Sequence, residues 1–373
     1  MNFRGCLPVV AVFAVLVRLV VDRLLAIPFG GLTQAMCQYD CGWYIRLAMQ
    51  GYDSDSLFAS YGAIPNFAFF PLFPMVLRAC VAVIGMSPYF VGILLTSLLF
   101  IGFILLSCRY LRLTRPAPDL LLWIVFAVLF PFGYTFTAVY SESLFALLTI
   151  AALLALRSNR ILAAAGLTAL LCATRPTGVL MLPLIIVDRG RFLWTGRHRT
   201  DRVALLGEAL LPIAIAPLGL SIYMLMQYRL TGDALAFNHV QVLWDRVWVG
   251  PFAMLAQGFG AWDWGLLLHP KGLPSQSYDA AWALLGLAAA SWMAWQRRFA
   301  EAWLCAASIV LPLSTGLHSL PRFVATNPFV LYATFDLVML VRNRLAIAAL
   351  FGTAGMLHGV LVVFWFISAS STY

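Results

Sequence analysis

Four ionisable residues of this 373-residue chain lie where an apolar run begins, breaks or ends, and they are Asp40, Glu142, Arg175 and Arg322. Ionisable groups at membrane depth are costly and usually face a cavity or one another. A carboxylate such as that of Asp40 can act as a general base toward a hydroxyl. The guanidinium groups of Arg175 and Arg322 can each bind phosphate oxygens through two donors at once. These residue types would suit a general base for a hydroxyl next to a binding site for a lipid phosphate.

Each of these residues also has a purely structural interpretation. Asp is a preferred N-cap, so Asp40 would cap an interfacial helix without a role in chemistry. Arg175 and Arg322 would equally form ion pairs with Glu142 or with another carboxylate. Glu142 itself would orient a substrate hydroxyl or one of the arginines, or act as a structural carboxylate only. The sequence leaves these alternatives open.

Other polar and aromatic residues are weaker candidates. His318, Glu142 and His239 are candidates for proton relay or acceptor binding, because an unperturbed histidine has a pKa near 6.5. A lone histidine at a helix end is, however, more often a structural hydrogen bonder. The candidate sugar contacts are Tyr39, Trp43, Tyr44, Gln241 and Trp244. An aromatic belt at the membrane interface explains the aromatic residues equally well.

The sequence predicts neither a metal site nor a bound cofactor. Cys37 and Cys41 share a polar loop and are four residues apart, but no histidine lies near them. Zinc sites take three or four ligands, so we predict no metal. An oxidised cysteine pair is the alternative, if this loop faces an oxidising compartment. There is no GxxxxGK[ST] loop, so neither ATP nor a nucleotide sugar is supported.

The composition excludes an ordinary soluble enzyme. Hydrophobic residues make up 62% of the chain and charged residues only 10%, whereas soluble domains carry about 25% charged residues. Apolar runs of the roughly 20 residues that cross a bilayer recur along almost the whole chain. We therefore predict an all-α, polytopic integral membrane protein with a single transmembrane domain over residues 1–373.

The net charge of +9 predicts membrane topology and no nucleic-acid partner. Basic residues in short loops mark the cytoplasmic side. We place the N-terminus in the cytoplasm and residues 67–86 at the interface, as a helical segment that does not cross. This topology puts 15 of the 24 basic residues on the cytoplasmic side. About eleven transmembrane helices follow, over residues 6–27, 88–108, 119–137, 141–156, 161–173, 176–187, 204–228, 279–296, 301–317, 324–341 and 346–369.

This topology leaves two long loops on the outer face, residues 28–66 and 229–278. The four ionisable residues described first converge on that face. The segment 161–187 is too short for two ordinary spans, and Arg175-Pro176 at its centre breaks a helix. We expect two half-length helices that meet inside a cavity there.

The first apolar run, residues 6–27, is expected to be a retained span. It contains Arg18, Asp22 and Arg23 and lacks a small-residue cleavage site. These features argue against a removed signal peptide.

Six short motifs follow one another along most of the chain. They are Tyr39-Asp40-Cys41-Gly42-Trp43-Tyr44-Ile45 with Ala48 and Gly51-Tyr52; Phe69-Phe70-Pro71-Leu72-Phe73-Pro74; Tyr140-Ser141-Glu142-Ser143-Leu144-Phe145; Thr174-Arg175-Pro176-Thr177-Gly178; Thr231-Gly232-Asp233 to Phe237; and Ser319-Leu320-Pro321-Arg322-Phe323. Each motif is weak alone, but their order is specific. Together they resemble the PIG-V family, the second mannosyltransferase of glycosylphosphatidylinositol assembly and its bacterial relatives, within the GT-C class of membrane glycosyltransferases.

The resemblance implies an inverting mannosyltransferase with a GT-C fold. Its donor would be polyprenyl-phosphate mannose, and its acceptor a hydroxyl of a lipid-linked, glycolipid or other membrane-associated molecule. An Asp in the first outer loop is the usual catalytic carboxylate of this class, which carries over to Asp40. Arg322, with Arg175, would bind the departing lipid phosphate. The family more often has Trp-Asp where this chain has Tyr39-Asp40.

The sequence leaves open the identity of the acceptor and whether mannose or another polyprenyl-linked sugar is transferred. We expect a bacterial inner membrane with the site facing the periplasm, or, for a eukaryotic protein, the ER membrane with a luminal site. A lipid or solute transporter would also carry buried charges and broken helices. A structural membrane scaffold is the third alternative.

Overall fold

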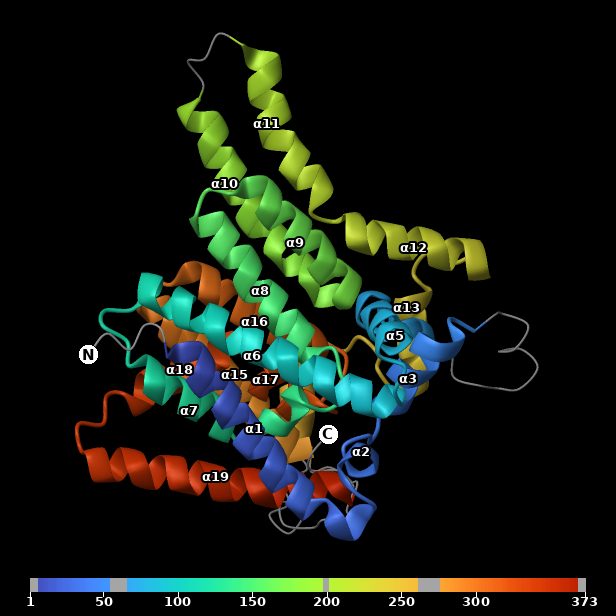
Figure 1. The fold of residues 1–373 in the computed structure, drawn as a ribbon. Coiled ribbons are helices and arrows are strands. Elements are labelled where there is room, and N and C mark those ends of the chain that lie inside the picture. The colour runs from blue at the N-terminus through green and yellow to red at the C-terminus, as the bar shows by residue number, and fades with distance from the viewer. Residues whose placement is uncertain (1–5, 54–65, 197–200, 261–275, 368–373) are drawn as a thin grey trace.

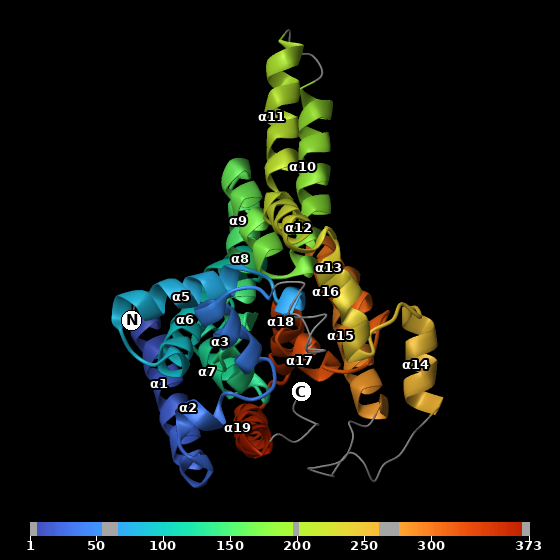
Figure 2. The same cartoon turned by 90° about the vertical axis from the view of Figure 1, so that its right-hand side faces the viewer.

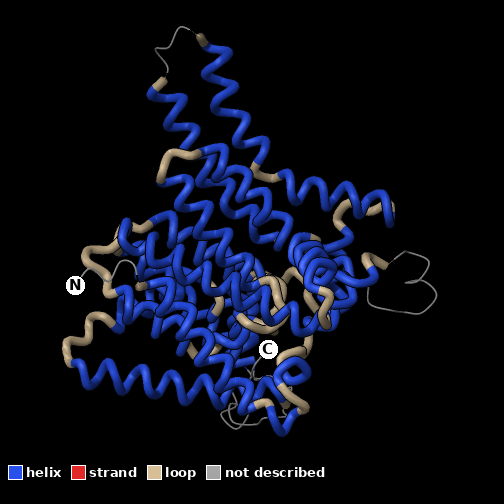
Figure 3. Tube along the Cα trace, in the orientation of Figure 1, coloured by secondary structure: helices blue, strands red, loops and turns tan. Residues whose placement is uncertain are grey.

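The computed structural model describes residues 6–53, 66–196, 201–260 and 276–367. Within these ranges every regular element is a helix (Figures 1 and 3), which confirms the predicted all-α class. The α-helices are α1 (Leu7–Leu25), α2 (Leu32–Ala35), α3 (Cys41–Gln50), α5 (Leu72–Ile84), α6 (Pro88–Thr114), α7 (Leu120–Leu129), α8 (Glu142–Arg157), α9 (Ile161–Thr174), α10 (Leu182–Thr195), α11 (Arg202–Ile215), α12 (Leu218–Thr231), α13 (Ala236–His239), α14 (Pro251–Gly260), α15 (Gln276–Trp295), α16 (Phe299–Leu313), α17 (Leu320–Ala325), α18 (Pro328–Val338) and α19 (Arg344–Phe366). The 3-10 helices are η2 (Ile27–Phe29), η3 (Asn66–Ala68), η4 (Gly133–Phe136), η5 (Pro176–Met181) and η6 (Val240–Trp244).

Two helices in the described ranges are long and apolar enough to cross a bilayer, namely α6 with 27 residues and α19 with 23. Helices α11 and α12 meet the same test when they are taken together, but they are bent by 51° at the break between them. Helix length and apolar composition thus support two or three crossings. The larger number of about eleven stays a prediction.

Prolines divide several of the apolar runs that the sequence predicts as single spans. Helix α7 ends shortly before Pro131, Pro217 lies between α11 and α12, and Pro328 begins α18 after a two-residue break that follows α17. Proline lacks an N–H donor and disfavours helical geometry at the residue before it. The runs are therefore apolar enough to lie in a membrane but fold as two helices each.

Helix α5 lies in the segment that is predicted to stay at the interface. Its 13 residues span about 20 Å, which is less than the roughly 30 Å of a bilayer core. Its buried side chains are Phe73, Pro74 and Leu77, and the helix packs against α3 and α6. Helices α7 and α18 are shorter still and lie in predicted spans, so the position of α5 at the interface stays a prediction.

A buried network of charged residues joins α6, α16 and α18 at one end of the helix bundle. Arg115, which follows α6, donates to both carboxylate oxygens of Glu301 in α16, at 2.9 and 3.0 Å. Asp336 in α18 accepts from both Arg115 and Arg298. The sequence predicts both arginines on the cytoplasmic side, and the structure brings them together at one end.

Helix α8 connects this end to the opposite one. Arg157 at its last turn lies over the ring of Tyr110, 5.3 Å from the ring centroid, and Tyr110 donates to Glu301. Glu142 begins the same helix, 15 residues earlier and hence about 22 Å away along the axis. Glu142 therefore lies at the end of the bundle away from the loops at Arg115, Arg157 and Arg298, which we call the arginine-rich loops.

Helices α1 and α19 are joined by a second buried polar cluster. Arg18 donates to the Gly133 carbonyl and to Thr137 Oγ1, both at 2.9 Å. His358 Nε2 lies 3.2 Å from the Asp22 carboxylate, which is fully buried. Because charges at this depth need partners, the cluster fixes α1 against η4 and α19.

The remaining helices flank this core. Helices α10 and α11 run side by side as a hairpin that projects away from the rest of the structure (Figures 1 and 2). Helix α9 packs on α8 and α12, and α15 packs on α16, α17 and α18. The ends of α8, α9 and α16 that face away from the arginine-rich loops lead into the candidate site.

Candidate active site

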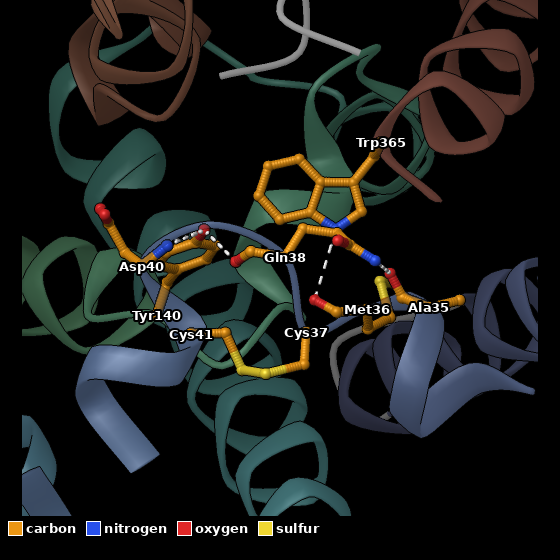
Figure 4. Close-up of a disulfide and its surroundings, with 8 residues drawn as sticks. All are labelled: Ala35, Met36, Cys37, Gln38, Asp40, Cys41, Tyr140 and Trp365. Carbon is orange, nitrogen blue, oxygen red and sulfur yellow. Dashed lines mark hydrogen bonds between the residues drawn. A yellow bond between two sulfur atoms is a disulfide. The ribbon is translucent and has the colours of Figure 1, made fainter. Parts of the chain in front are cut away.

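Asp40 lies at the N-cap position of α3, but its side chain does not cap the helix. Instead its Oδ2 accepts a hydrogen bond of 2.9 Å from Nη1 of Arg322. The turn that carries Asp40 is closed by a disulfide between Cys37 and Cys41 (Figure 4). Of the alternatives left open by the sequence, the structure thus has an ion-paired Asp40 and an oxidised cysteine pair.

Glu142 connects the two arginines. Its Oε1 accepts a short hydrogen bond from Nη2 of Arg175 and lies 3.5 Å from Nε of Arg322. The side chains are 0% exposed for Glu142, 4% for Arg322, 14% for Asp40 and 19% for Arg175. Two carboxylates and two guanidinium groups therefore form one continuous, largely buried chain, which we call the Asp40 cluster.

The local structure at Arg175 follows from its place before a proline. Helix α9 ends at Thr174, and Arg175 is extended, with φ −155° and ψ 151°, because Pro176 disfavours the helical region for the residue before it. Gly178 then packs against the backbone of α9, where an added Cβ would come 2.4 Å from the Leu171 carbonyl carbon. The predicted break is confirmed, although α10 continues to Thr195, beyond the expected half-helix.

Arg322 is placed by a turn between α16 and α17. Ser319 has a positive φ of 68° at the start of α17, and Pro321 lies in the first turn of that short helix. The aromatic ring of Phe323 lies beside three guanidinium groups, 5.0 Å from Arg322 and 5.6 Å from both Arg175 and Arg246. This geometry allows cation–π attraction at each arginine.

Hydroxyl groups support the cluster from α3 and α8. Arg175 Nε donates to Ser141 Oγ at 3.0 Å, and the Tyr44 hydroxyl lies 2.9 Å from the same oxygen. Tyr44 is buried, and its ring packs edge-on against Phe69 and Phe73. Tyr44, predicted as a sugar contact, therefore holds Arg175 through Ser141.

His318 lies at the edge of the Asp40 cluster, in the turn before α17. Arg246 Nη2 donates to its backbone carbonyl at 3.1 Å. Partial burial lowers the pKa of the imidazole, the positive charges of Arg246 and Arg322 lower it further, and the negative charge of Asp40 raises it. The neutral form of His318 is therefore favoured near neutral pH.

The candidates in the second outer loop lie in other surroundings. His239 Nδ1 is 2.6 Å from Asp233 Oδ2, and both side chains are exposed. The hydrogen bond to His239 lowers the pKa of Asp233. Gln241 Nε2 donates to the Phe237 carbonyl at 3.3 Å.

The predicted aromatic contacts divide into two groups. Trp43 stacks on Phe69, with centroids 5.8 Å apart, and Trp244 packs edge-on against both rings. These three rings form an aromatic cluster one turn of α3 beyond Asp40. Tyr39 does not belong to that cluster, because its ring packs on Trp365 of α19 at 5.2 Å.

Two contributors were not singled out from the sequence. Tyr140 was noted only as part of a motif, yet its hydroxyl contacts the backbone that carries Asp40. Arg246 lies in the second outer loop and was not a candidate, yet it contacts Phe323 and His318. Their positions next to Glu142 and in the second outer loop are the only sequence signals for them.

The arrangement suits proton transfer and anion binding. The partly exposed carboxylate of Asp40 pairs with Arg322, and Glu142 links Arg322 to Arg175. A carboxylate and two guanidinium groups in one cluster suit the binding of a hydroxyl and a phosphate at adjacent positions. In the described part of the chain, no three His, Cys, Asp or Glu side chains are grouped as metal ligands.

No protein-family model matches the chain, and no curated protein matches it.

Proposed function

We propose that the protein is an inverting membrane glycosyltransferase that moves mannose from polyprenyl-phosphate mannose to a hydroxyl of a lipid-linked or membrane-associated acceptor. The observation that carries the proposal is the Asp40 cluster. Its four charged side chains come from four distant parts of the chain and meet at the end of the bundle away from the arginine-rich loops. The order of the PIG-V-like motifs supplies the reaction class.

The proposed reaction is a single displacement. Asp40 accepts the proton of the acceptor hydroxyl while that oxygen forms a bond to C1 of the mannose. The bond from C1 to the phosphate oxygen breaks, and its electron pair leaves with the lipid phosphate. Arg322 and Arg175 stabilise the negative charge on that phosphate. A β-linked mannosyl phosphate then gives an α-mannoside.

The same proposal assigns roles to the surrounding residues. In this proposal Trp43 and Trp244, which contact each other, would contact the sugar. His318, favoured in its neutral form, would take up a proton after Asp40. His239, paired with exposed Asp233, would contact the acceptor at the surface.

The membrane arrangement in this proposal is a GT-C-type domain with about eleven crossings and the site on the outer side. The Cys37–Cys41 disulfide supports that side, because disulfides persist in oxidising compartments such as the periplasm or the ER lumen. The donor's polyprenyl chain would lie between helices in the bilayer. The expected location is a bacterial inner membrane, or the ER membrane in a eukaryote.

A lipid or solute transporter is the second candidate function. It is favoured by the bend of 51° between α11 and α12 and by the helix break at Arg175, since transporters place broken helices around their binding sites. A transporter would move substrate between compartments without forming a new glycosidic bond.

The test is sugar transfer by the purified full-length protein, supplied with synthetic polyprenyl-phosphate mannose and an extract of membrane lipids as acceptors. We compare wild type with Asp40→Asn, and with Asp245→Asn as a matched control because Asp245 is exposed in the second outer loop. Transfer by wild type and Asp245→Asn but not by folded Asp40→Asn supports the proposal.

Two other outcomes count against it. Equal transfer by Asp40→Asn removes Asp40 as the base. Uptake of donor lipid into vesicles without any transfer product favours the transporter.

A further inference from the structure

The turn that carries Asp40 is held by the hydroxyl of Tyr140. This hydroxyl donates to the Gln38 carbonyl at 2.8 Å and accepts from the Asp40 backbone N–H at 3.0 Å (Figure 4). The two bonded groups lie on either side of Tyr39, which has a positive φ of 48°. One side chain thus fixes the backbone on both sides of a residue whose conformation non-glycine residues rarely adopt.

The ring of the same tyrosine contacts the other member of the ion pair. The Arg322 guanidinium lies 5.1 Å from the centroid of the Tyr140 ring. The ring also packs edge-on against Trp365 and Tyr44, at 5.6 and 6.0 Å. Tyr140 is almost completely buried, so these neighbours hold its ring in place.

Other restraints act on the same turn but not on Arg322. The disulfide joins Cys37 to Cys41, and Trp365 Nε1 donates to the Met36 carbonyl at 3.3 Å. These contacts fix where the turn begins and ends. Tyr140, in contrast, contacts both the backbone of Asp40 and the guanidinium that pairs with the Asp40 carboxylate.

We propose that Tyr140 is a positioning residue that holds the Asp40 carboxylate and the Arg322 guanidinium in register for the transfer reaction. The proposal rests on the proposed function, in which Asp40 is the base and Arg322 binds the leaving phosphate. A general base must lie within hydrogen-bonding reach of the proton it removes, and a displacement of about 1 Å can cost a hundredfold in rate. The hydroxyl sets the position of the Asp40 backbone, and the ring sets that of Arg322.

The kinetic test uses Tyr140→Phe in the full-length protein. This variant keeps the ring beneath Arg322 and loses only the bridging hydroxyl, so kcat is expected to fall about tenfold while KM for the donor stays unchanged. Tyr140→Leu also removes the ring and is expected to lower kcat further and to raise KM. The matched control is Tyr332→Phe. Tyr332 is also buried and donates a hydrogen bond of 2.8 Å to Ser107, but it does not belong to the Asp40 cluster. That control is expected to keep kcat.

A second measurement does not depend on activity. Hydrogen exchange of the Asp40 amide is expected to be about tenfold faster in Tyr140→Phe than in wild type, because the amide loses its acceptor. Tyr332→Phe is expected to leave this amide unchanged. An unchanged Asp40 amide in Tyr140→Phe would overturn the inference, whatever the transfer assay gives.

The two assays separate failure of this inference from failure of the proposed function. Faster exchange with an unchanged kcat overturns a positioning role and leaves the transferase proposal intact. Absence of transfer in wild type counts against the proposed function. The positioning role is then overturned as well, even if hydrogen exchange shows that Tyr140 holds the turn. A lower kcat in Tyr332→Phe equal to that in Tyr140→Phe overturns the specific role of Tyr140.

Discussion

The three glutamates of the chain allow a direct test of the Asp40 cluster. Glu142 lies in the cluster, Glu301 lies in the charged network near the opposite end of α8, and Glu208 is exposed on α11. Changing each to Gln removes one negative charge and nearly conserves the shape of the side chain. The environment of the residue alone then decides the effect.

The expected magnitudes follow from the contacts. Glu142 bonds to Arg175 and lies 3.5 Å from Arg322, so Glu142→Gln leaves two neighbouring guanidinium groups with Asp40 as their remaining carboxylate in the cluster. Two unit charges about 4 Å apart interact by about 4 kcal/mol at an effective dielectric constant of 20, and breaking a buried ion pair costs about 3–5 kcal/mol. Because Arg175 is 19% exposed, we expect about 3 kcal/mol for Glu142→Gln.

The two other variants provide the scale. Glu301 is fully buried and accepts from both terminal nitrogens of Arg115 and from Tyr110, so Glu301→Gln is expected to cost about 3–5 kcal/mol. Exposed Glu208 is expected to contribute less than about 1 kcal/mol. The assay is the free energy of unfolding in mixed micelles, measured together with sugar transfer on folded protein.

The stability and activity results carry separate conclusions. Glu142→Gln and Glu301→Gln should both be destabilised, but only Glu142→Gln should lose transfer. If Glu142→Gln is no less stable than Glu208→Gln, the ion-pair reasoning is wrong. If Glu301→Gln loses transfer as completely as Glu142→Gln, the loss reflects the fold and not the site.

Two further predictions concern His318 and the disulfide. Arg246→Met removes a positive charge beside His318 and should raise the pKa of its imidazole, whereas Asp40→Asn removes a negative charge and should lower that pKa further. An NMR titration of the histidine rings measures both pKa changes. A change of the opposite sign in either variant contradicts the assignment of these charged neighbours. Reduction of the Cys37–Cys41 disulfide opens a loop with a sequence separation of 4 and should cost roughly 2 kcal/mol of unfolding free energy in the chain-entropy model. The double variant Cys37→Ser/Cys41→Ser should show no response to reductant, and an equal response there would attribute the loss to another group.

Local features of the fold were predictable because they depend on residues next to one another. The low content of charged residues and the long apolar runs indicated an all-α protein, and Arg175-Pro176 indicated the end of α9. The same reasoning did not reveal that Pro217 would bend an apolar run by 51°. A proline forbids certain backbone geometries, but the packing of α12 against α9 selects the angle that is adopted.

The candidate site was predictable as a set of residue types but not as an arrangement. Glu142, Arg175, Arg322 and Asp40 were all identified as ionisable groups at the ends or breaks of apolar runs, where burial requires a partner. The sequence did not decide whether the arginines bind substrate or form ion pairs. Asp40 and Glu142 are both predicted on the outer face, so each arginine has more than one carboxylate with which it could pair. It also gave His239 and His318 similar roles, whereas the structure pairs His239 with exposed Asp233 and places His318 near Asp40.

By itself, the sequence determined the helical class, the apolar character and the residues that must find partners, since these depend on composition and on neighbours along the chain. Only the tertiary structure decided that Arg322 pairs with Asp40 across 282 residues and that Tyr140 holds the turn between Gln38 and Asp40. No local pattern encodes such pairs, because they form only when packed helices bring distant turns within hydrogen-bonding distance. Because an unpaired buried charge is strongly destabilising, the arrangement that pairs these charges is favoured over packings that leave them without a partner.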